Sequence, residues 1–329
     1  MTPSAVSVIV EGDNEPHCPE SEQLCLGLRG LLEQDFPLNQ VDLIMVGSQE
    51  QIERWQRQTA GMPFARVRLI PAEGVDYFQM KQAGAELATS SIIAFVDSDV
   101  YPSPHWLTTL VETIESGFDV SAGLTQLRWH GMFGPGSPLM LALGSVSWGA
   151  IQGPAVGGET PAIGFHSNNV GFRADLLQVG WYKPGLLRAC AAHGLFQSWT
   201  RAGRRVAFRP KQHVVHAFTP DWWAGMHARG GMESLLMRRL FPNWPHRWVS
   251  RLKPLEPMLT AAWRSWRDPK QWWRYGSAVG LSKARRIAML PAVVAVSILT
   301  RSVEMLGAYR GMLRGDLQRE LVAHRQAGF

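Results

Sequence analysis

The chain contains 329 residues, 46% of them hydrophobic, which is long enough for one large domain with an appendage and apolar enough to build a core. Its three cysteines, Cys18, Cys25 and Cys190, exclude a disulfide framework and fit a reducing cytoplasm. The net charge of +6 is uneven, because residues 1–200 carry 10 Lys and Arg against 20 Asp and Glu, whereas residues 201–329 carry 23 against 7. The basic C-terminal third predicts an anionic partner, such as phospholipid head groups or a phosphorylated lipid.

The N-terminal part of the chain is predicted to alternate strands and helices. Apolar and β-branched runs predict strands at Ser7–Val10, Val41–Val46 and Val67–Ile70. The segments between and after them are predicted to be helices, at Leu24–Gln34, Gln49–Gln58 and Lys81–Thr89. Strands that alternate with helices imply a parallel sheet with right-handed crossovers.

The next strand-like run, Ser91–Val96, leads into two carboxylates, Asp97 and Asp99, separated by one residue. Successive side chains of a strand point to opposite faces, so these acids can act together only where the strand gives way to a loop. That edge of an open α/β sheet is where ligands bind. Paired oxygen ligands suit Mg²⁺ or Mn²⁺, and such a cation would hold a diphosphate. The alternative is that both acids are solvated and cap the helix after Pro102 and Pro104.

This order of elements resembles the GT-A domain of family 2 glycosyltransferases over roughly residues 5 to 220. Segments similar to the family's motifs are the opening strand with Asn14-Glu15, the first helix and its ending at Leu28–Pro37, the helix Lys81–Ala88, the acidic motif Phe95–Asp99, Ser167–Arg173, and the closing strand at Val206–His216. The resemblance implies a Rossmann-like α/β fold, in which a mostly parallel sheet is flanked by helices. It also implies a transferase that uses a nucleotide-sugar donor.

The resemblance assigns roles to the acidic motif and to the closing histidine. Asp97 would lie near the nucleotide ribose, and Asp99 would bind Mg²⁺ or Mn²⁺ on the diphosphate. His216 would be a further metal or phosphate contact, although a histidine at the end of a strand is also commonly structural. His213 forms a His-x-x-His pair with it, but no Cys or acidic residue accompanies the pair, so no zinc site is predicted.

Other positions are expected to contact the donor. Asp13 and Asn14 follow the first strand and, with Asn169, would face the nucleotide. Lys81 would either neutralise phosphate or lie on a solvated helix face. The family usually has an Asp after its second strand that reads the base, but this chain has Gly47-Ser48-Gln49 there. Glu50 or Asp76 would have to substitute for it.

The general base is the larger departure from the family. The acidic Glu-Asp pair that the family carries before its Ala-Gly, here Ala202-Gly203, corresponds to Ala191-Ala192. An inverting transferase needs a group that takes the proton from the acceptor hydroxyl, and His is competent because its pKa is near neutral. His193 is therefore the predicted base, against the alternative that it is a helix residue without a catalytic role. Asp175 and Glu159 are further candidates.

Two other functions compete with the transferase. The string Asp97-Ser98-Asp99-Val100 also satisfies the acidic motif of haloacid-dehalogenase-type phosphatases. Those enzymes need a later Lys and a further acidic pair for Mg²⁺, and no Asp-Asp or Gly-Asp-x-x-x-Asp string follows residue 99, so that function is disfavoured. The other rival is a degenerate, non-catalytic nucleotide-sugar or glycan-binding protein, motivated by Ala191-Ala192.

Tryptophan and basic residues are concentrated after residue 220. Amphipathic aromatic rings among basic side chains suit a membrane interface. Nucleic acid could use the same mixture through stacking and phosphate contacts, but a neighbouring apolar segment favours lipid, so no nucleic-acid partner is expected. Packing against the catalytic domain would account for some of these rings. The tryptophans are Trp222, Trp223, Trp244, Trp248, Trp263, Trp266, Trp272 and Trp273.

The apolar segment is Ile287–Leu299, which is bounded by arginines and interrupted by Pro291. A spanning helix needs about 20 apolar residues, so this segment is predicted to be too short to cross a bilayer comfortably. A monotopic or re-entrant segment, or a helical hairpin with Val303–Leu313, fits better. Met1–Val10 runs directly into the first strand, so no secretory signal is predicted.

The sequence therefore predicts a GT-A nucleotide-sugar-binding catalytic domain at residues 1–220 and a basic, Trp-rich helical tail at residues 221–329. The predicted activity is inverting, metal-dependent transfer of a sugar from a nucleotide sugar to a hydroxyl, on an acceptor that is lipid-linked or close to the membrane. The predicted location is the cytoplasmic face of the membrane, with peripheral or monotopic attachment.

Overall fold

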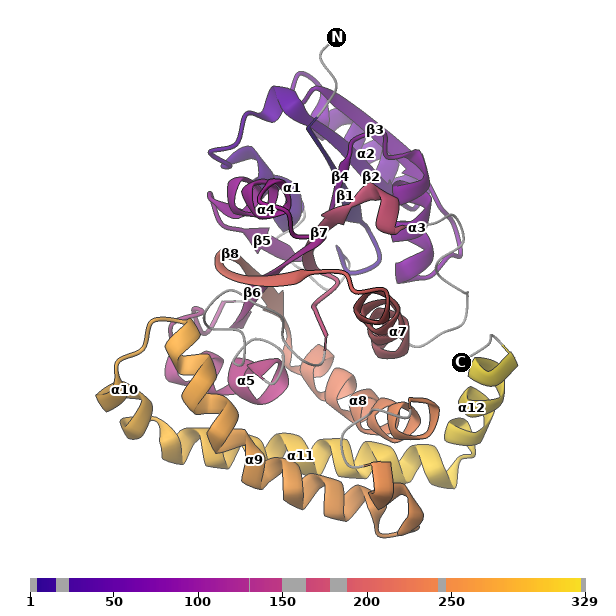
Figure 1. Ribbon diagram of the computed structural model, residues 1–329, viewed down its shortest axis with the longest axis vertical. Coiled ribbons are helices and arrows are strands. Elements are labelled where there is room, and N and C mark those ends of the chain that lie inside the picture. The colour runs from indigo at the N-terminus through magenta and orange to yellow at the C-terminus, as the bar shows by residue number, and fades with distance from the viewer. Residues whose placement is uncertain are drawn as a thin grey trace.

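The computed structural model describes residues 5–15, 24–129, 131–149, 164–177, 188–241 and 247–326. Figure 1 shows a curled sheet flanked by helices, with a layer of long helices packed beneath it. The N-terminus lies at the end of the sheet that is remote from the long helices, and the C-terminus lies beside them.

The described strands form one mixed sheet with the order β3-β2-β1-β4-β7-β6-β8-β5. β1 pairs in parallel with β2 and β4, and β2 with β3, whereas β7 is antiparallel to both β4 and β6. This arrangement confirms the predicted α/β class. The strands are β1 (Val6–Glu11), β2 (Val41–Gly47), β3 (Arg66–Pro71), β4 (Ile92–Asp97), β5 (Val100–Pro102), β6 (Val120–Trp129), β7 (Asn169–Arg173) and β8 (Val206–Phe218).

The central strands are buried on both faces. Val8 of β1 and Leu43 of β2 belong to the core under α1, α2 and α4, whereas Ile9, Ile44 and Phe95 belong to the core under α3 and α7. Alternation along each strand explains this division, because successive side chains point to opposite faces. A sheet covered on both sides leaves the C-terminal edge of its parallel strands as the open place for a ligand.

Capping residues set the start of two helices near that edge. Ser48 and Gln51 form a capping box at α2, and Asp76 and Gln79 form another at α3. α3 therefore begins at Tyr77, before the predicted start at Lys81. The helices are α1 (Leu26–Leu32), α2 (Gln49–Thr59), α3 (Tyr77–Leu87), α4 (Trp106–Glu115), α5 (Pro138–Ser147), α7 (Arg188–Arg201), α8 (Pro220–Leu240), α9 (Glu256–Ala278), α10 (Lys283–Ala288), α11 (Leu290–Leu313) and α12 (Asp316–Gln326).

The apolar segment of the tail differs from its prediction. Pro291 lies in the first turn of α11, where its missing N–H leaves no intrahelical bond unmade, so the helix runs unbroken from Leu290 to Leu313. The hairpin with Val303–Leu313, one of the predicted alternatives, is therefore wrong, because both segments lie in one continuous helix. α11 has 24 residues and, by length and composition alone, could cross a membrane.

A buried cluster of charges joins α11 to the helices beside it. Arg301 donates to Asp268 of α9 at 2.9 and 3.0 Å and to Glu304 at 2.6 Å. Glu304 also accepts from Arg264 of α9 at 2.6 Å and contacts the His227 ring of α8 at 3.2 Å. Burial alone would raise the pKa of Glu304, but the charges of Arg264 and Arg301 outweigh it and hold that pKa well below its usual range. The cluster therefore joins α8, α9 and α11 through ionised groups.

Replacing Glu304 by Ala should lower the free energy of unfolding by about 3 to 5 kcal/mol, because two buried arginines lose their shared carboxylate. Urea unfolding followed by tryptophan fluorescence measures the change. Glu112→Ala removes an exposed carboxylate on α4 and should alter that free energy by less than about 0.5 kcal/mol. Equal effects of the two substitutions would show that the cluster does not stabilise the tail.

The contribution of Glu304 should also depend on pH. Its pKa is lowered in the folded chain, so the stabilisation is fully present above the ordinary value of 4.5 and is lost as the pH falls below it. The difference in unfolding free energy between the wild type and Glu304→Gln should therefore shrink as the pH is lowered through that value. A difference that stays constant or grows on acidification would contradict this sign.

Candidate active site

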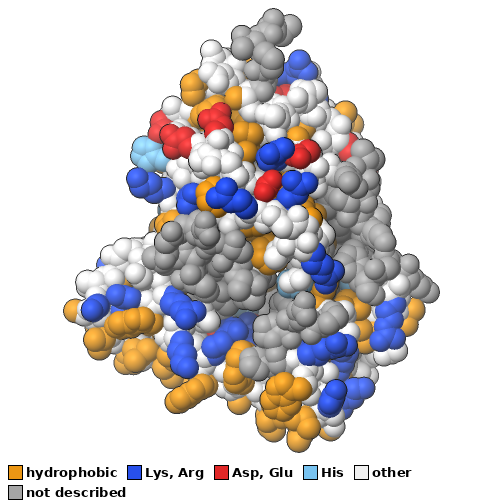
Figure 2. All heavy atoms as spheres, viewed as in Figure 1, with side chains coloured by type: hydrophobic (Ala, Val, Ile, Leu, Met, Phe, Trp, Pro, Cys, Tyr) orange, Lys and Arg blue, Asp and Glu red, His pale blue; other side chains and the backbone are white. Residues whose placement is uncertain are grey.

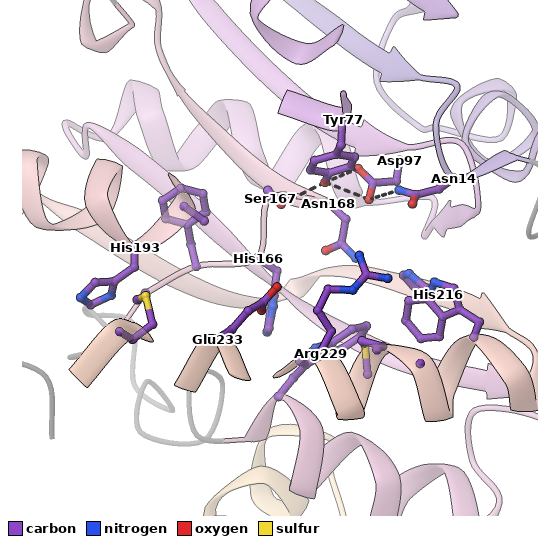
Figure 3. Close-up of a pocket in the computed structure, with 18 of the residues that line it drawn as sticks. Asn14, Tyr77, Asp97, His166, Ser167, Asn168, His193, His216, Arg229 and Glu233 are labelled. Carbon is purple, nitrogen blue, oxygen red and sulfur yellow. Dashed lines mark hydrogen bonds between the residues drawn. The ribbon is translucent and has the colours of Figure 1, made fainter. Parts of the chain in front are cut away.

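A cavity of about 670 Å³ lies between the C-terminal edge of the sheet and α8 (Figure 3). Asn14, from the loop after β1, and Asp97, from the end of β4, line it on the sheet side, together with Tyr77 of α3. His193 of α7 and Glu233 of α8 line other parts of it. The cavity therefore joins the edge where the acidic motif lies to the first helix of the tail.

Asp97 is held by three side chains. The Lys81 Nζ donates to its carboxylate at 2.6 Å, the Tyr77 hydroxyl at 2.9 Å and the Asn14 amide at 3.1 Å. Lys81 is fully buried, and its ammonium lies 4.6 Å from the centre of the Tyr77 ring. Tyr77 and Lys81 are one turn apart on α3 and both face β4. The alternatives of a solvated helix face for Lys81 and a solvated capping role for Asp97 are therefore wrong.

The loop after β1 is shaped by a residue that the sequence analysis did not select. Glu11, fully buried at the end of β1, accepts from the backbone N–H of Asp13 at 2.6 Å and from the Asn14 side chain at 2.9 Å. Asn14 thereby contacts the carboxylates of Glu11 and Asp97 at once. Asp13 lies next to it in the loop and is half-buried.

Asp99 and His216 lie together although they are far apart in the sequence. β5 pairs antiparallel with β8 so that Val100 lies opposite His216. The His216 Nε2 is then 3.4 Å from a carboxylate oxygen of Asp99. Both residues are almost completely buried, at 4% and 1% exposed, and the Trp222 ring lies 4.9 Å from that of His216.

This pair has the donor chemistry of a Mg²⁺ or Mn²⁺ site. Mg²⁺ at nucleotide sites is commonly held by one or two carboxylates with the rest of its shell from substrate phosphates and water, and imidazole is a further ligand for softer divalent metals. No group of three or more His, Cys, Asp or Glu that could hold a metal occurs among the residues that the structure describes. A metal at Asp99 and His216 would therefore need oxygens from a bound diphosphate.

Asn169 does not line the cavity as expected. It is fully buried within the sheet, where its amide donates to the Leu124 carbonyl at 3.0 Å and accepts from the Trp106 indole at 2.8 Å. Asn168, its neighbour, lines the cavity instead. Successive residues at the start of a strand face opposite ways, so the predicted nucleotide contact falls on the wrong member of the pair.

The two residues predicted to recognise the nucleotide base, Asp76 and Glu50, lie outside the cavity. Asp76 caps α3 by accepting from the backbone N–H groups of Phe78 and Gln79, both at 3.0 Å. Glu50 is exposed in the first turn of α2. Neither residue lines the cavity described above.

Of the candidate bases, only His193 reaches the cavity among those that the structure describes. Its ring packs edge-on against Phe241 at 4.7 Å, at the end of the cavity remote from Asp97 in Figure 3. Asp175 is exposed and binds Arg173 at 3.0 Å on the surface, so it is not a candidate. Glu159 lies outside the described residues.

One face of α8 forms a wall of the cavity. Met226, Arg229, Glu233 and Met237 follow one another at intervals of three or four residues, and all of them line it. Figure 3 shows Arg229 directed toward the side with Asn168 and His216, and Glu233 lying between His193 and Asp97. These polar residues were not predicted from the sequence, although their helical spacing directly after His216 was a usable signal.

His166 is a further cavity residue that was missed. Burial, and to a smaller extent the charge of His216, lower its pKa to about 3. Its imidazole is therefore neutral at physiological pH and is a weak proton acceptor. His213, in contrast, contacts Gln126 at 2.9 Å, and burial lowers its pKa to about 4, which suits a structural role.

Known proteins are similar to this chain in sequence and in fold. The family model described as glycosyl transferase family 2 matches residues 22–131, which include the acidic motif. A glucosyl-dolichyl phosphate glucuronosyltransferase from Haloferax volcanii is 27% identical over 243 residues, covering 66% of this chain and 72% of that relative.

One solved structure supports the fold. The mannosyltransferase PcManGT from Pyrobaculum calidifontis, in complex with GDP-Man and Mn²⁺, has a TM-score of 0.54 and 15% identity, over 95% of this chain and 88% of that one. TarS from S. aureus covers 94% of this chain and 91% of its own, at 17% identity and a lower TM-score of 0.48. The predicted resemblance to family 2 glycosyltransferases is confirmed by the family model and by the relative, and the predicted GT-A-like fold is confirmed by the mannosyltransferase structure.

Proposed function

We propose that this glycosyltransferase is inverting and metal-dependent, and that it moves a sugar from a nucleotide sugar to a hydroxyl of a lipid-linked or membrane-proximal acceptor. The observation that carries the proposal is the contact between the buried Asp99 and His216, because His216 lines the cavity on the same side as Asp97. A volume of about 670 Å³ is in the range of sites that enclose small ligands.

The donor would lie on the sheet side of the cavity. Asp97 and Asn14 would face the nucleoside, while Asp99 and His216 would hold Mg²⁺ or Mn²⁺ on the diphosphate. The metal, when bound, supplies positive charge that offsets the negative charge growing on the leaving nucleoside diphosphate. Arg229 is directed toward the same side and would add a second cation there.

The acceptor would enter between this side and α8. Its hydroxyl oxygen attacks the anomeric carbon in line, the bond from that carbon to the phosphate oxygen breaks, and a base takes the hydroxyl proton. A single displacement of this kind inverts the anomeric centre. The base must therefore lie on the acceptor side, opposite the diphosphate.

Glu233 is the base that we propose. Ala191 and Ala192 cannot accept a proton, and the His193 ring packs against Phe241 at the remote end of the cavity. Glu233 supplies a carboxylate from α8, between that end and Asp97. His193 is then a wall of the acceptor site. A carboxylate in this position favours an enzyme over a non-catalytic binding protein.

The acceptor and the location are inferred from separate observations. The relative from Haloferax volcanii is named for a dolichyl phosphate substrate, and α11 is long and apolar enough to contact a bilayer. Work at the cytoplasmic face is part of the proposal.

Replacing Asp99 by Ala should lower metal-dependent donor hydrolysis at least about 100-fold, because metal binding supplies several kcal/mol of charge stabilisation and each tenfold is about 1.4 kcal/mol. The assay uses a panel of nucleotide sugars with Mn²⁺ or Mg²⁺. Asp175→Ala, which removes an exposed carboxylate, should keep the wild-type rate. Unchanged hydrolysis in Asp99→Ala would refute the metal site, and donor binding without turnover, even with membrane lipids supplied, would favour the binding-protein alternative.

Replacing Lys81 by Met should destabilise the fold by about 3 to 5 kcal/mol, because the buried Asp97 carboxylate loses its cation. Donor affinity should fall as well, since the groups that hold Asp97 also shape the cavity. Thermal unfolding and donor titration measure the two effects. Lys211→Met, at an exposed position of β8, should change neither, and an equally stable Lys81→Met would mean that Asp97 does not need this partner.

Replacing Glu233 by Gln should slow sugar transfer about 100- to 10,000-fold, as expected for loss of a general base, with little effect on the dissociation constant of the donor. His193→Gln is the matched comparison and should mainly raise the KM of the acceptor. Single-turnover transfer, with acceptor present, separates the two variants. If single-turnover transfer is lost in His193→Gln and kept in Glu233→Gln, His193 is the general base and Glu233 is not.

A further inference from the structure

The tail carries an apolar strip on the side that faces away from the catalytic cavity. Trp266 on α9 is 77% exposed, and Ile298 and Leu306 on α11 are 56% and 64% exposed. Figure 2 shows hydrophobic side chains along the bottom of the molecule, where the tail helices lie, with Lys and Arg among and above them. The acidic side chains visible in that view lie over the sheet. We call this strip the tail face and define it by Met258, Trp266, Trp273, Val294, Ile298 and Leu306.

The two sides of α11 have opposite chemistry. Leu290, Val294 and Ile298 follow at intervals of four residues and are exposed. The only charged residues of α11 before Arg310 are Arg301 and Glu304, and both are buried on the other side. The outward side is therefore uncharged over most of the length of the helix, which is unusual for a surface left in water.

The buried charged residues of α11 limit how this helix can contact lipid. Arg301 and Glu304 are paired with Asp268 and Arg264 of α9 and with His227 of α8. A helix that crossed the bilayer alone would leave these partners and carry two charges into hydrocarbon. α11 therefore stays packed against α8 and α9, and only its outward side is available to lipid.

Basic residues flank the tail face. Lys270 and Arg274 are exposed on α9, Lys283 and Arg285 are exposed in α10, and Arg310 is exposed near the end of α11. Trp266 and Trp273 lie within the strip, where an indole ring can be half-immersed at the level of the head groups. Apolar side chains bordered by cations complement an anionic lipid surface better than they complement another copy of this basic tail.

We propose that the tail face is a monotopic docking surface for an anionic phospholipid bilayer, with α9 and α11 lying in the plane of the interface. This inference deepens the membrane-proximal site of the proposed function and rests on it only for the identity of the acceptor. It makes α11 an in-plane element instead of a transmembrane span.

Close packing would transmit the docked orientation to the cavity. A Cβ atom added at Gly231 of α8 would lie 1.8 Å from the carbonyl oxygen of Glu304, and one at Gly307 of α11 would lie 2.0 Å from that of Ala228. The two helix backbones are therefore in direct contact at these glycines. Since the other side of α8 carries Arg229 and Glu233, docking would hold the cavity at a fixed height above the head groups.

The test is co-sedimentation of the full chain with phosphatidylcholine vesicles, with and without phosphatidylglycerol. The wild type should bind the anionic vesicles, and the double substitution Ile298→Glu with Leu306→Glu should lower the apparent affinity at least tenfold. Leu87→Glu, at an exposed apolar position of α3, should bind like the wild type. All three proteins should hydrolyse donor equally in solution, so loss of vesicle binding is separate from loss of the proposed activity.

Several results would overturn the docking surface. Absence of wild-type binding to either vesicle, or equal binding by the double variant, would do so. So would a wild-type dimer in solution that the double variant converts to monomer without any change in vesicle binding, since a second copy would then cover the face. Circular dichroism and thermal unfolding confirm that the variants are folded.

A labelling experiment separates the in-plane arrangement from a span. Lys283→Cys and Arg314→Cys place thiols at exposed positions beyond the two ends of α11. With the protein bound to the outside of sealed vesicles, an impermeant maleimide should label both positions equally, after correction for the native cysteines. Protection of one end alone would establish a transmembrane helix and refute the in-plane arrangement.

Discussion

The buried ion pair between Lys81 and Asp97 is the interaction on which the rest of the site depends. A carboxylate at the end of a buried strand is costly unless its charge and its lone pairs are matched. Lys81 supplies the charge, and Tyr77 and Asn14 supply hydrogen bonds. These contacts tie β4 to α3 and to the loop after β1. They also give the two acids of the motif different surroundings. Asp97 is bound by three side chains, whereas Asp99 lies against the imidazole of His216.

One continuous stretch of chain links the metal candidate to the tail. β8 places His216 against Asp99, and Thr219 then caps α8 by accepting from the backbone N–H of Trp222. The first turns of α8 begin directly beneath the sheet edge, so the helix forms a wall of the cavity before it reaches the other tail helices. The tail is therefore not a separate appendage, because its first helix belongs to the site.

The sequence was informative where local pattern decides structure. β-Branched runs predicted β1, β2 and β4, and the spacing of Asp97 and Asp99 predicted the edge at which they lie. The sequence was uninformative where a small rotation of the chain or a contact between distant residues determines which side chain reaches the cavity. Neighbouring asparagines, Asn168 and Asn169, have the same chemistry, and only their alternation at the start of β7 makes one of them line the cavity. Pro291 was predicted to interrupt the apolar segment, but it lies in the first turn of α11. The sequence alone does not distinguish a proline that interrupts a helix from one that begins it.

Glu233 belongs to no catalytic motif, and only its helical spacing after His216 indicates that it could line a site, because helix packing brings it to the cavity. The same packing explains why α11 keeps two charged residues that a spanning helix would exclude. Arg301 and Glu304 need α8 and α9 as partners, and the glycines at positions 231 and 307 let α8 and α11 approach closely enough to provide them. A helix that is fixed in this way cannot move toward lipid without moving the wall of the active site. The position of the outward face of α11 is therefore coupled to the position of the cavity wall formed by α8.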